Sequence, residues 1–134
     1  MKQLHIFLEN KPGRIERITA ILAEAEINII AMTIQDTGEY GLFKVLLERP
    51  DEAQTILSEK GFACALKDVL AVRVADRPGE LNRMVALLNS KGINIKDGHG
   101  FPRPDNESVF CAEVDDLAAV ERVVSAAGYQ LFDA

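Results

Sequence analysis

The sequence has few of the features that mark membrane-bound, disulfide-stabilised or metal-binding proteins. Charged residues interrupt each apolar stretch well before the roughly 20 residues that a membrane-spanning helix needs. The opening segment, MKQLHIFLEN, is too short and too mixed for a signal peptide. Cys64 and Cys111 lie 47 positions apart, a spacing that indicates neither a disulfide framework nor a metal motif. We therefore expect a cytoplasmic protein with reduced thiols, no metal site and no membrane association.

Positive charge is also scarce, and tryptophan is absent. The chain has 15 Lys and Arg residues against 21 Asp and Glu residues, a formal net charge of -6, and no basic run. Because nucleic-acid binding depends mainly on contacts between basic side chains and phosphates, a nucleic-acid role is disfavoured. With 48% hydrophobic and 27% charged residues, the 134-residue chain has the composition of a folded globular protein.

The two halves of the chain repeat one pattern. LHIFLENKPGRI, which starts at Leu4, aligns with LAVRVADRPGEL, which starts at Leu70, and INI at 27–29 aligns with INI at 93–95. GLFKVLLE aligns in the same order with SVFCAEVD. We infer an internal duplication and predict two domains, 1–67 and 68–134, with almost no linker between them. Because a unit of about 65 residues buries only roughly 60% of its unfolded surface, each half should be marginally stable alone.

Each half has the order strand, helix, strand, strand, helix, strand. Apolar and polar residues alternate from Leu4 to Leu8 and from Leu70 to Val74, as in half-buried strands. Pro12 and Pro78 suit the first turn of the helices that follow. Parallel strands joined through a helix need a right-handed crossover, which the split βαβ arrangement provides. We therefore predict an α+β chain of two tandem ferredoxin-like βαββαβ units with antiparallel sheets.

Two segments depart from the repeat. Gly92 suits the left-handed position that ends a helix, whereas its counterpart Glu26 does not. We therefore expect the first helix to end differently or at an energetic cost. The segment Gly98–Asn106 (GHGFPRPDN) is rich in turn-forming residues, and we expect a long loop there.

The third strand of each half indicates a covered sheet. One set of alternating residues is suited to face the helices: Phe43, Val45 and Leu47, matched by Phe110, Ala112 and Val114. The opposite set comprises Leu42, Lys44 and Leu46, matched by Val109, Cys111 and Glu113. This second set is too apolar for a fully exposed sheet face. We predict sheet-to-sheet packing, most simply in a homodimer; the alternative is a scatter of exposed apolar residues.

The corner between the first strand and first helix of each half could bind a ligand. It reads NKPGRI at 10–15 and DRPGEL at 76–81. Glycine allows close approach of a ligand, and the start of a helix offers N–H groups and a positive dipole end to a carboxylate. Asn10 or Asp76 could accept hydrogen bonds from an ammonium group. A free amino acid carries both charged groups, but a well-formed turn without a ligand would also explain the pattern.

The corner motif, the amphipathic helix after it and the INI segment resemble the ACT domain, a small regulatory module with a βαββαβ fold. The resemblance covers nearly the whole chain, as in stand-alone tandem ACT proteins. It implies binding of an amino acid or another small metabolite at interfaces between paired domains, and control of a biosynthetic enzyme. Carried over by position, the ligand-binding residues are Asn10, Gly13, Arg14, Ile15, Asn28, Asp76, Gly79, Glu80, Leu81 and Asn94. Asn10 in place of an acidic residue, and Glu26 in place of glycine, leave open whether both halves bind.

Some of these residues also have a simpler structural interpretation. Asn28 and Asn94 suit the exit from a helix. Ile15, Leu81 and Met32 keep the periods of their helix or strand, which favours a place in the core over one in a pocket.

Nothing in the sequence indicates catalysis or a cofactor. It contains no G-x-S-x-G elbow and no Walker loop, and Gly98-His99-Gly100 lacks the third glycine of a nucleotide-binding loop. We predict a non-catalytic regulatory protein that binds an amino acid and controls a metabolic enzyme allosterically. The alternative is a regulatory subunit of a separate biosynthetic enzyme, similar to the acetolactate synthase small subunit. An acylphosphatase-like enzyme is disfavoured by the proline in the corner, and an RNA-binding module by the lack of exposed strand aromatics besides Phe7, whose repeat partner is Arg73.

Overall fold

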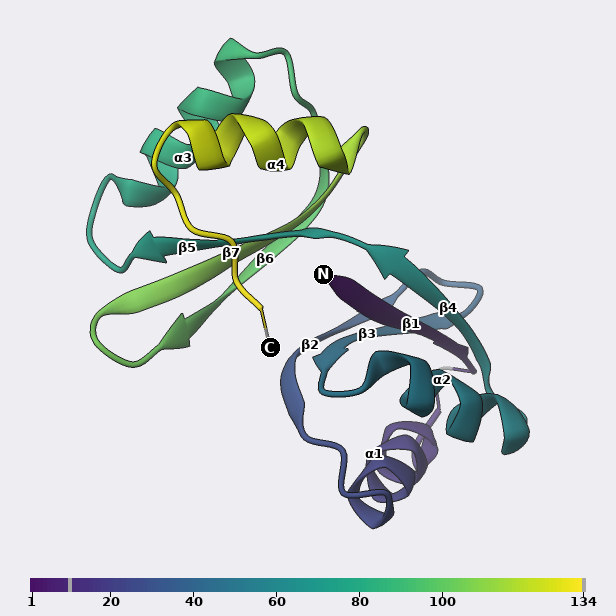
Figure 1. The fold of residues 1–134 in the computed structure, drawn as a ribbon. Helices are drawn as coiled ribbons and strands as arrows, with labels where there is room; N and C mark the ends of the chain where they lie inside the picture. Colours follow the sequence, from purple (N-terminus) through teal and green to yellow (C-terminus); the bar gives the residue numbers. More distant parts are fainter. Residues whose placement is uncertain (10, 134) are drawn as a thin grey trace. The chain divides into compact units, whose positions relative to one another are not determined.

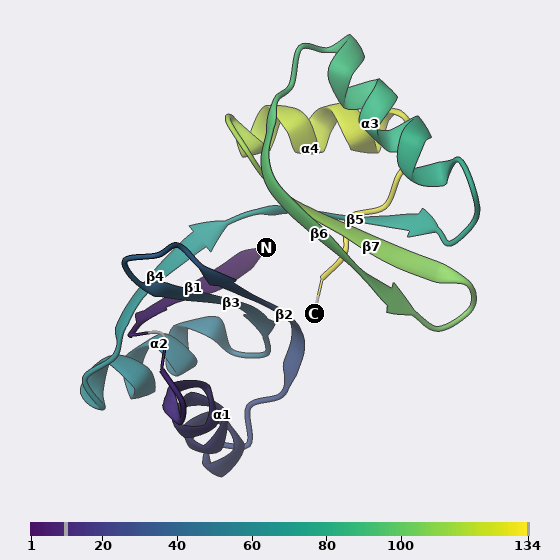
Figure 2. The same cartoon turned by 180° about the vertical axis from the view of Figure 1, so that it is seen from behind.

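The computed structural model describes residues 1–9 and 11–133, which form two compact units. The N-terminal unit comprises residues 2–67, and the C-terminal unit comprises residues 68–133 together with Met1. The elements, in chain order, are β1 (Lys2–Leu8), α1 (Arg14–Glu24), β2 (Ile29–Asp36), β3 (Gly41–Leu47), α2 (Pro50–Glu59), β4 (Ala63–Asp68), β5 (Leu70–Ala75), α3 (Glu80–Ser90), β6 (Ile95–Arg103), β7 (Glu107–Val114) and α4 (Leu117–Ala126) (Figures 1 and 2). The predicted α+β class, with antiparallel sheets in two repeated units, is confirmed.

The N-terminal unit has a four-stranded sheet in the order β2-β3-β1-β4, with α1 and α2 on one face (Figure 1). In the antiparallel pair β1–β3, Leu4 lies opposite Val45 and Ile6 lies opposite Phe43. These alternating residues face the helices, as the sequence pattern predicted.

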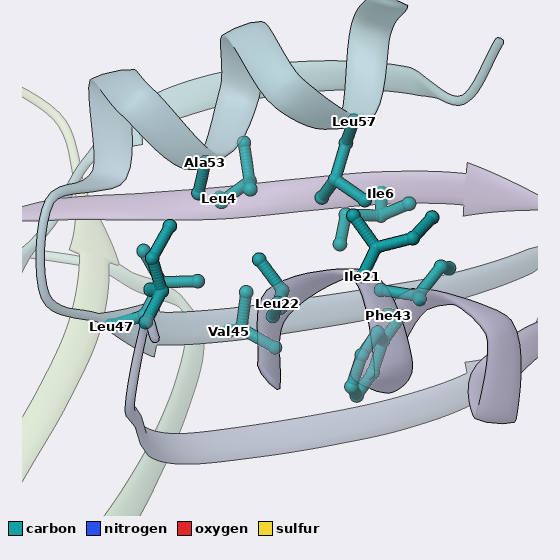
Figure 3. Close-up of a cluster of buried hydrophobic side chains, with 11 residues drawn as sticks. Leu4, Ile6, Ile21, Leu22, Phe43, Val45, Leu47, Ala53 and Leu57 are labelled. Carbon is teal, nitrogen blue, oxygen red and sulfur yellow. The ribbon is translucent and has the colours of Figure 1, made fainter. Parts of the chain in front are cut away.

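Eleven buried side chains form the core of the N-terminal unit: Leu4, Ile6, Ile18, Ile21, Leu22, Ile27, Phe43, Val45, Leu47, Ala53 and Leu57. Figure 3 shows Ala53 and Leu57 of α2 directed toward the strands, opposite the side chains of β1 and β3. This burial of the apolar stripes of both helices against one sheet face is the main stabilising contribution to such a unit.

The C-terminal unit has the strand order β5-β7-β6, with α3 and α4 on one face of the sheet (Figure 2). A short segment after α4 extends this sheet, because the Arg73 N–H donates to the Gln130 carbonyl (2.9 Å) and the Phe132 N–H donates to the Ala71 carbonyl (2.8 Å). This segment takes the position beside β5 that β4 takes beside β1. The core comprises Leu70, Val72, Val74, Met84, Leu88, Ala112, Val114, Val120 and Val124.

The sheet faces turned away from the helices also contain buried residues. Leu46, Val109 and Cys111 are buried without belonging to either helix-facing cluster. The burial of these three residues is consistent with the prediction that the strand face turned away from the helices is too apolar to be fully exposed. The homodimer remains a prediction.

Two sequence expectations about local structure were wrong. Pro12 and Pro78 lie before the helices, which begin at Arg14 and Glu80 after a glycine N-cap. The expected long loop Gly98–Asn106 is mostly strand, because β6 continues to Arg103 in register with β7 and leaves only residues 104–106 in the turn. Pairing with a neighbouring strand outweighs the turn preference of glycine and proline there.

The end of α1 matches the expectation of an energetic cost. Glu26 adopts a left-handed backbone with φ 57°, close to the φ of 69° at Gly92. The guanidinium of Arg49 donates to the carbonyls of Glu26 (2.7 Å) and Ala25 (3.1 Å), which satisfies acceptors at this helix end. Within the described part of the chain, no helix is long and apolar enough to span a membrane.

Candidate ligand-binding site

The two proline–glycine corners have the same backbone geometry. Gly13 has φ 93° and ψ -17°, and Gly79 has φ 90° and ψ -16°. An added Cβ would meet nothing within 4 Å at either position, so the backbone conformation, and not a lack of space, requires glycine. The hydrogen bonds repeat as well. The Arg17 N–H donates to the Gly13 carbonyl and the Arg83 N–H donates to the Gly79 carbonyl, both at 3.0 Å.

Among the residues that the structure describes, no side chain caps the helices that begin at these corners. Gly13 and Gly79 occupy the N-cap positions of α1 and α3 and supply no side-chain acceptor. By contrast, the carboxylate of Asp116 accepts the Ala119 N–H at the start of α4, at 3.3 Å. The first turns of α1 and α3 therefore offer N–H groups and a positive dipole end to an external anion.

The corner of the C-terminal unit borders a pocket of about 500 Å³. This volume lies within the roughly 300–1,000 Å³ of small-molecule sites. The lining comes from the end of β5, the corner, α3, β6 and β7, and comprises Val74, Ala75, Asp76, Arg77, Leu81, Ile95, Gly98, His99, Gly100, Ser108, Val109 and Phe110. Asp76 and Leu81, two of the predicted ligand-binding residues, are thus brought together at one cavity.

Two glycines of β6 leave this pocket open. Gly98 lies opposite Ala112 and Gly100 lies opposite Phe110, so both are on the helix-facing side of the sheet. An added Cβ would lie 3.3 Å from the Cys111 carbonyl oxygen at Gly98 and 3.5 Å from the Val109 carbonyl oxygen at Gly100. The sequence interpretation placed these glycines in a loop and missed their role. Comparison of the residues at the same pairing positions in the two halves would have revealed them.

The turn of the β6–β7 hairpin is hydrogen-bonded to the same corner. The Asp76 N–H donates to the Asn106 carbonyl at 2.8 Å. Asp105 and Asn106 have φ of 67° and 56°, the left-handed conformation of a tight hairpin turn. The backbone of the corner is therefore fixed both by its own helix and by a turn 30 residues further along the chain.

The charged side chains at the two corners differ. In the N-terminal unit, Glu9 forms ion pairs with Lys11 (2.9 Å) and Arg14 (3.7 Å), and the hydrogen bond from Lys11, followed by its charge, lowers the pKa of Glu9. In the C-terminal unit, Arg77 pairs with Glu80 at 3.2 Å. Arg14 and Glu9 line a smaller pocket of about 270 Å³, away from β2.

The other predicted site residues have varied surroundings. Asn10 lies outside the described residues. Ile15 packs against the core, as its helical period favoured. Asn28 and Asn94 are exposed, and the pocket described above includes neither Asn94 nor Gly79 and Glu80 in its lining. The predicted core positions of Leu81 and Met32 are wrong, because these side chains are 55% and 53% exposed.

The thiols show no sign of chemical activation. Burial raises the pKa of Cys111 to about 12 and also raises that of Cys64, which disfavours the reactive thiolate of both residues. Within residues 1–9 and 11–133, no group of three His, Cys, Asp or Glu residues is arranged to hold a metal ion.

Comparison with known proteins places the chain in a family. The model of the ACT domain pair matches residues 1–124, and no curated protein matches the sequence. Protein BT0572 from Bacteroides thetaiotaomicron superposes with a TM-score of 0.92 at 28% identity, over 98% of this chain and 90% of that one. The ligand-free regulatory subunit of aspartate kinase from Thermus thermophilus has the same fold, with a TM-score of 0.70 at 17% identity over 95% and 92% of the two chains.

Proposed function

Because the chain belongs to the ACT domain pair family, we propose that it is a non-catalytic regulatory protein that binds an amino acid and controls a metabolic enzyme. The observation that carries this proposal is the pocket of about 500 Å³ at the corner of the C-terminal unit. This pocket combines a carboxylate, a helix start without a capping side chain and apolar walls.

The two charged groups of an amino acid would have separate partners at this corner. Asp76 is exposed at the rim, where its carboxylate would accept hydrogen bonds from the ammonium group. The N–H groups at the start of α3 and the nearby Arg77 guanidinium would bind the carboxylate. The side chain of the ligand would then extend toward β6. Glu80, which lies at the first position of α3, holds Arg77 in place by their ion pair.

Regulation would follow from a difference in ligand affinity between two states of the protein. A ligand shifts a conformational or assembly equilibrium only if it binds one state more tightly than the other. We propose that the states differ in how ACT domains pair, most simply within a homodimer in the cytoplasm. The fold shared with a regulatory subunit of aspartate kinase supports an enzyme of amino-acid biosynthesis as the target.

The second candidate is a permanent regulatory subunit of a separate biosynthetic enzyme, in the manner of the acetolactate synthase small subunit. The shared fold of the aspartate kinase regulatory subunit favours this candidate too, because that subunit, by its name, is a chain of regulatory function within a kinase. The two candidates differ in whether the isolated chain binds a ligand.

Thermal unfolding with each of the twenty amino acids tests the proposal. A ligand present at 100 times its dissociation constant stabilises the folded state by about 2.7 kcal/mol, which gives a clear rise in Tm. We expect such a rise with one or a few amino acids, and its loss in Asp76→Asn. The matched control, Asp68→Asn, removes an exposed carboxylate of the same unit outside the pocket and should leave the rise unchanged.

Two other outcomes would count against the proposal. Absence of any rise in Tm, together with co-purification of an enzyme, would favour the permanent subunit. Persistence of the rise in the double variant Asn10→Ala/Asp76→Ala would contradict the assignment of the site to either corner.

A further inference from the structure

The strand beside the pocket differs between the two units at two positions. In the N-terminal unit, Met32 lies opposite Val45 and Ile34 lies opposite Phe43. In the C-terminal unit, Gly98 lies opposite Ala112 and Gly100 opposite Phe110. Because Val45 and Phe43 align with Ala112 and Phe110, Met32 and Ile34 occupy the positions of the two glycines. One unit therefore has two large side chains where the other has none.

Those two glycines determine how far the pocket extends beyond the corner. Both lie on the side of the sheet that α3 covers, and both line the cavity. Met32 and Ile34 project from the equivalent side of β2, and their side chains are 53% and 54% exposed. In the N-terminal unit, these side chains take the space that the glycines leave empty in the C-terminal unit.

The first strand provides a second difference. The corner of the C-terminal unit follows Ala75, an uncharged residue that lines the pocket. Its aligned residue in the N-terminal unit is Glu9, whose carboxylate is held by Lys11 at 2.9 Å. The N-terminal corner therefore has a charged, already paired group at a position where the C-terminal pocket is apolar.

The inner walls of the C-terminal pocket indicate the class of ligand. The charged residues of the lining, Asp76 and Arg77, lie at the corner. Beyond them, the side chains on the helix-facing side are mainly apolar, with one hydroxyl: Val74, Leu81, Ile95, Phe110 and Ser108; His99 and Val109 also border the cavity, from the alternate positions of β6 and β7. A charged ligand side chain would lose its hydration against such walls without gaining a partner, whereas an aliphatic or aromatic side chain would gain from the burial.

We infer that the C-terminal pocket, and not the equivalent position of the N-terminal unit, binds one amino acid with a large apolar side chain. This inference rests on the proposed function, since it specifies the ligand class and the number of sites for the same regulatory binding. Leucine, isoleucine, valine, methionine and phenylalanine are the members of this class that fit a pocket with charge at one end only.

Isothermal titration of the full chain tests the ligand class and the stoichiometry. We expect binding of at least one of leucine, isoleucine, valine, methionine or phenylalanine, at one molecule per chain, and at least tenfold weaker binding of lysine, threonine, aspartate and alanine. Preference for a charged or small amino acid, or two equal sites per chain, would overturn this inference while leaving the proposed function intact. Failure of all twenty amino acids to bind would instead overturn the proposed function.

Exchange of residues between the two units tests the position of the site. Gly100→Ile introduces the side chain found at position 34 and should weaken binding at least tenfold. An added Cβ at Gly100 would lie 3.5 Å from the Val109 carbonyl oxygen, an ordinary contact, so the backbone has room for a side chain there, and the rest of the isoleucine would extend into the cavity. The milder variant Gly100→Ala should weaken binding less, and circular dichroism should show that both variants fold.

The control is the double variant Met32→Ala/Ile34→Ala, which changes the equivalent positions of the N-terminal unit. It should bind the same amino acid with unchanged affinity. Unchanged binding by a folded Gly100→Ile variant, or loss of binding in a folded Met32→Ala/Ile34→Ala variant, would overturn the assignment to the C-terminal unit.

Discussion

The residues that follow α1 and α3 show that the two repeats adopt the same left-handed backbone with different residue types. Gly92 adopts its left-handed conformation without a steric penalty, whereas Glu26 adopts nearly the same φ with a Cβ. The Arg49 side chain compensates in part, because it hydrogen-bonds two carbonyls at the end of α1. The sequence allowed the energetic cost at Glu26 to be predicted. The hydrogen bonds from Arg49 could not be predicted, because Arg49 lies 23 positions away along the chain and no local pattern connects it to Glu26.

Replacement of Glu26 by glycine should stabilise the protein. We expect the free energy of unfolding to rise by about 0.5–1 kcal/mol, because relief of the left-handed strain exceeds the added entropy of the unfolded chain. The hydrogen bonds from Arg49 go to backbone carbonyls and survive the change. Urea unfolding measures the effect, and Gly92→Glu should shift stability in the opposite direction. A decrease in stability for Glu26→Gly would show that the glutamate side chain contributes more than its strained backbone costs.

The exposed position of Leu81 shows the limit of periodicity at the residue scale. A helical pattern identifies the side of α3 that faces the sheet, but it does not show where the sheet stops. Leu81 lies in the first turn, over the pocket next to Gly98 and Gly100, so the surface that it would cover is missing. Because Gly98 and Gly100 of β6 have no side chains to pack against Leu81, Leu81 borders a pocket where its helical period predicted a place in the core.

At the scale of elements, alternation and helical period were sufficient for most strands and helices. The error at Gly98–Asn106 arose because turn-forming residues were weighed by their local preference. In the structure, β7 supplies hydrogen-bonding partners for most of this segment as far as Arg103, and only residues 104–106 turn. Strand pairing depends on a partner elsewhere in the sequence, which a local pattern cannot reveal.

The start of α4 provides a test at the element scale. Asp116 has φ 48°, and its carboxylate accepts the Ala119 N–H. Asp116→Ala should lower the free energy of unfolding by about 1–2 kcal/mol, because it removes the cap and leaves a non-glycine residue in the left-handed region. Asp116→Asn retains an acceptor oxygen and a residue type that tolerates this conformation, so it should retain most of the stability. Equal loss in both variants, measured by urea unfolding, would contradict a capping role.

At the scale of the whole molecule, the duplication was evident from the sequence, while assembly and ligand identity were not. Each unit has its own core, and the chain passes from β4 to β5 through Val69 alone. Units of about 65 residues bury too little surface to be strongly stable alone. We therefore predict that the two units unfold in one cooperative transition.

Core truncation in each unit tests this cooperativity. Leu57→Ala and Leu88→Ala each remove a fully buried side chain, one from each core. Each should cost about 2–5 kcal/mol, and both should lower the Tm of the same single calorimetric peak. Two separate peaks, of which each variant shifts only one, would show that the units unfold independently.

The hydrogen bond between the Asp76 N–H and the Asn106 carbonyl has a practical consequence. It couples the tip of a solvent-exposed hairpin to the rim where an ammonium group would bind. A dye attached at Asp105, which is exposed and whose side chain is absent from the pocket lining, would sit one residue from that coupling without blocking entry. Its emission would then provide an optical readout of occupancy that needs no knowledge of the downstream enzyme.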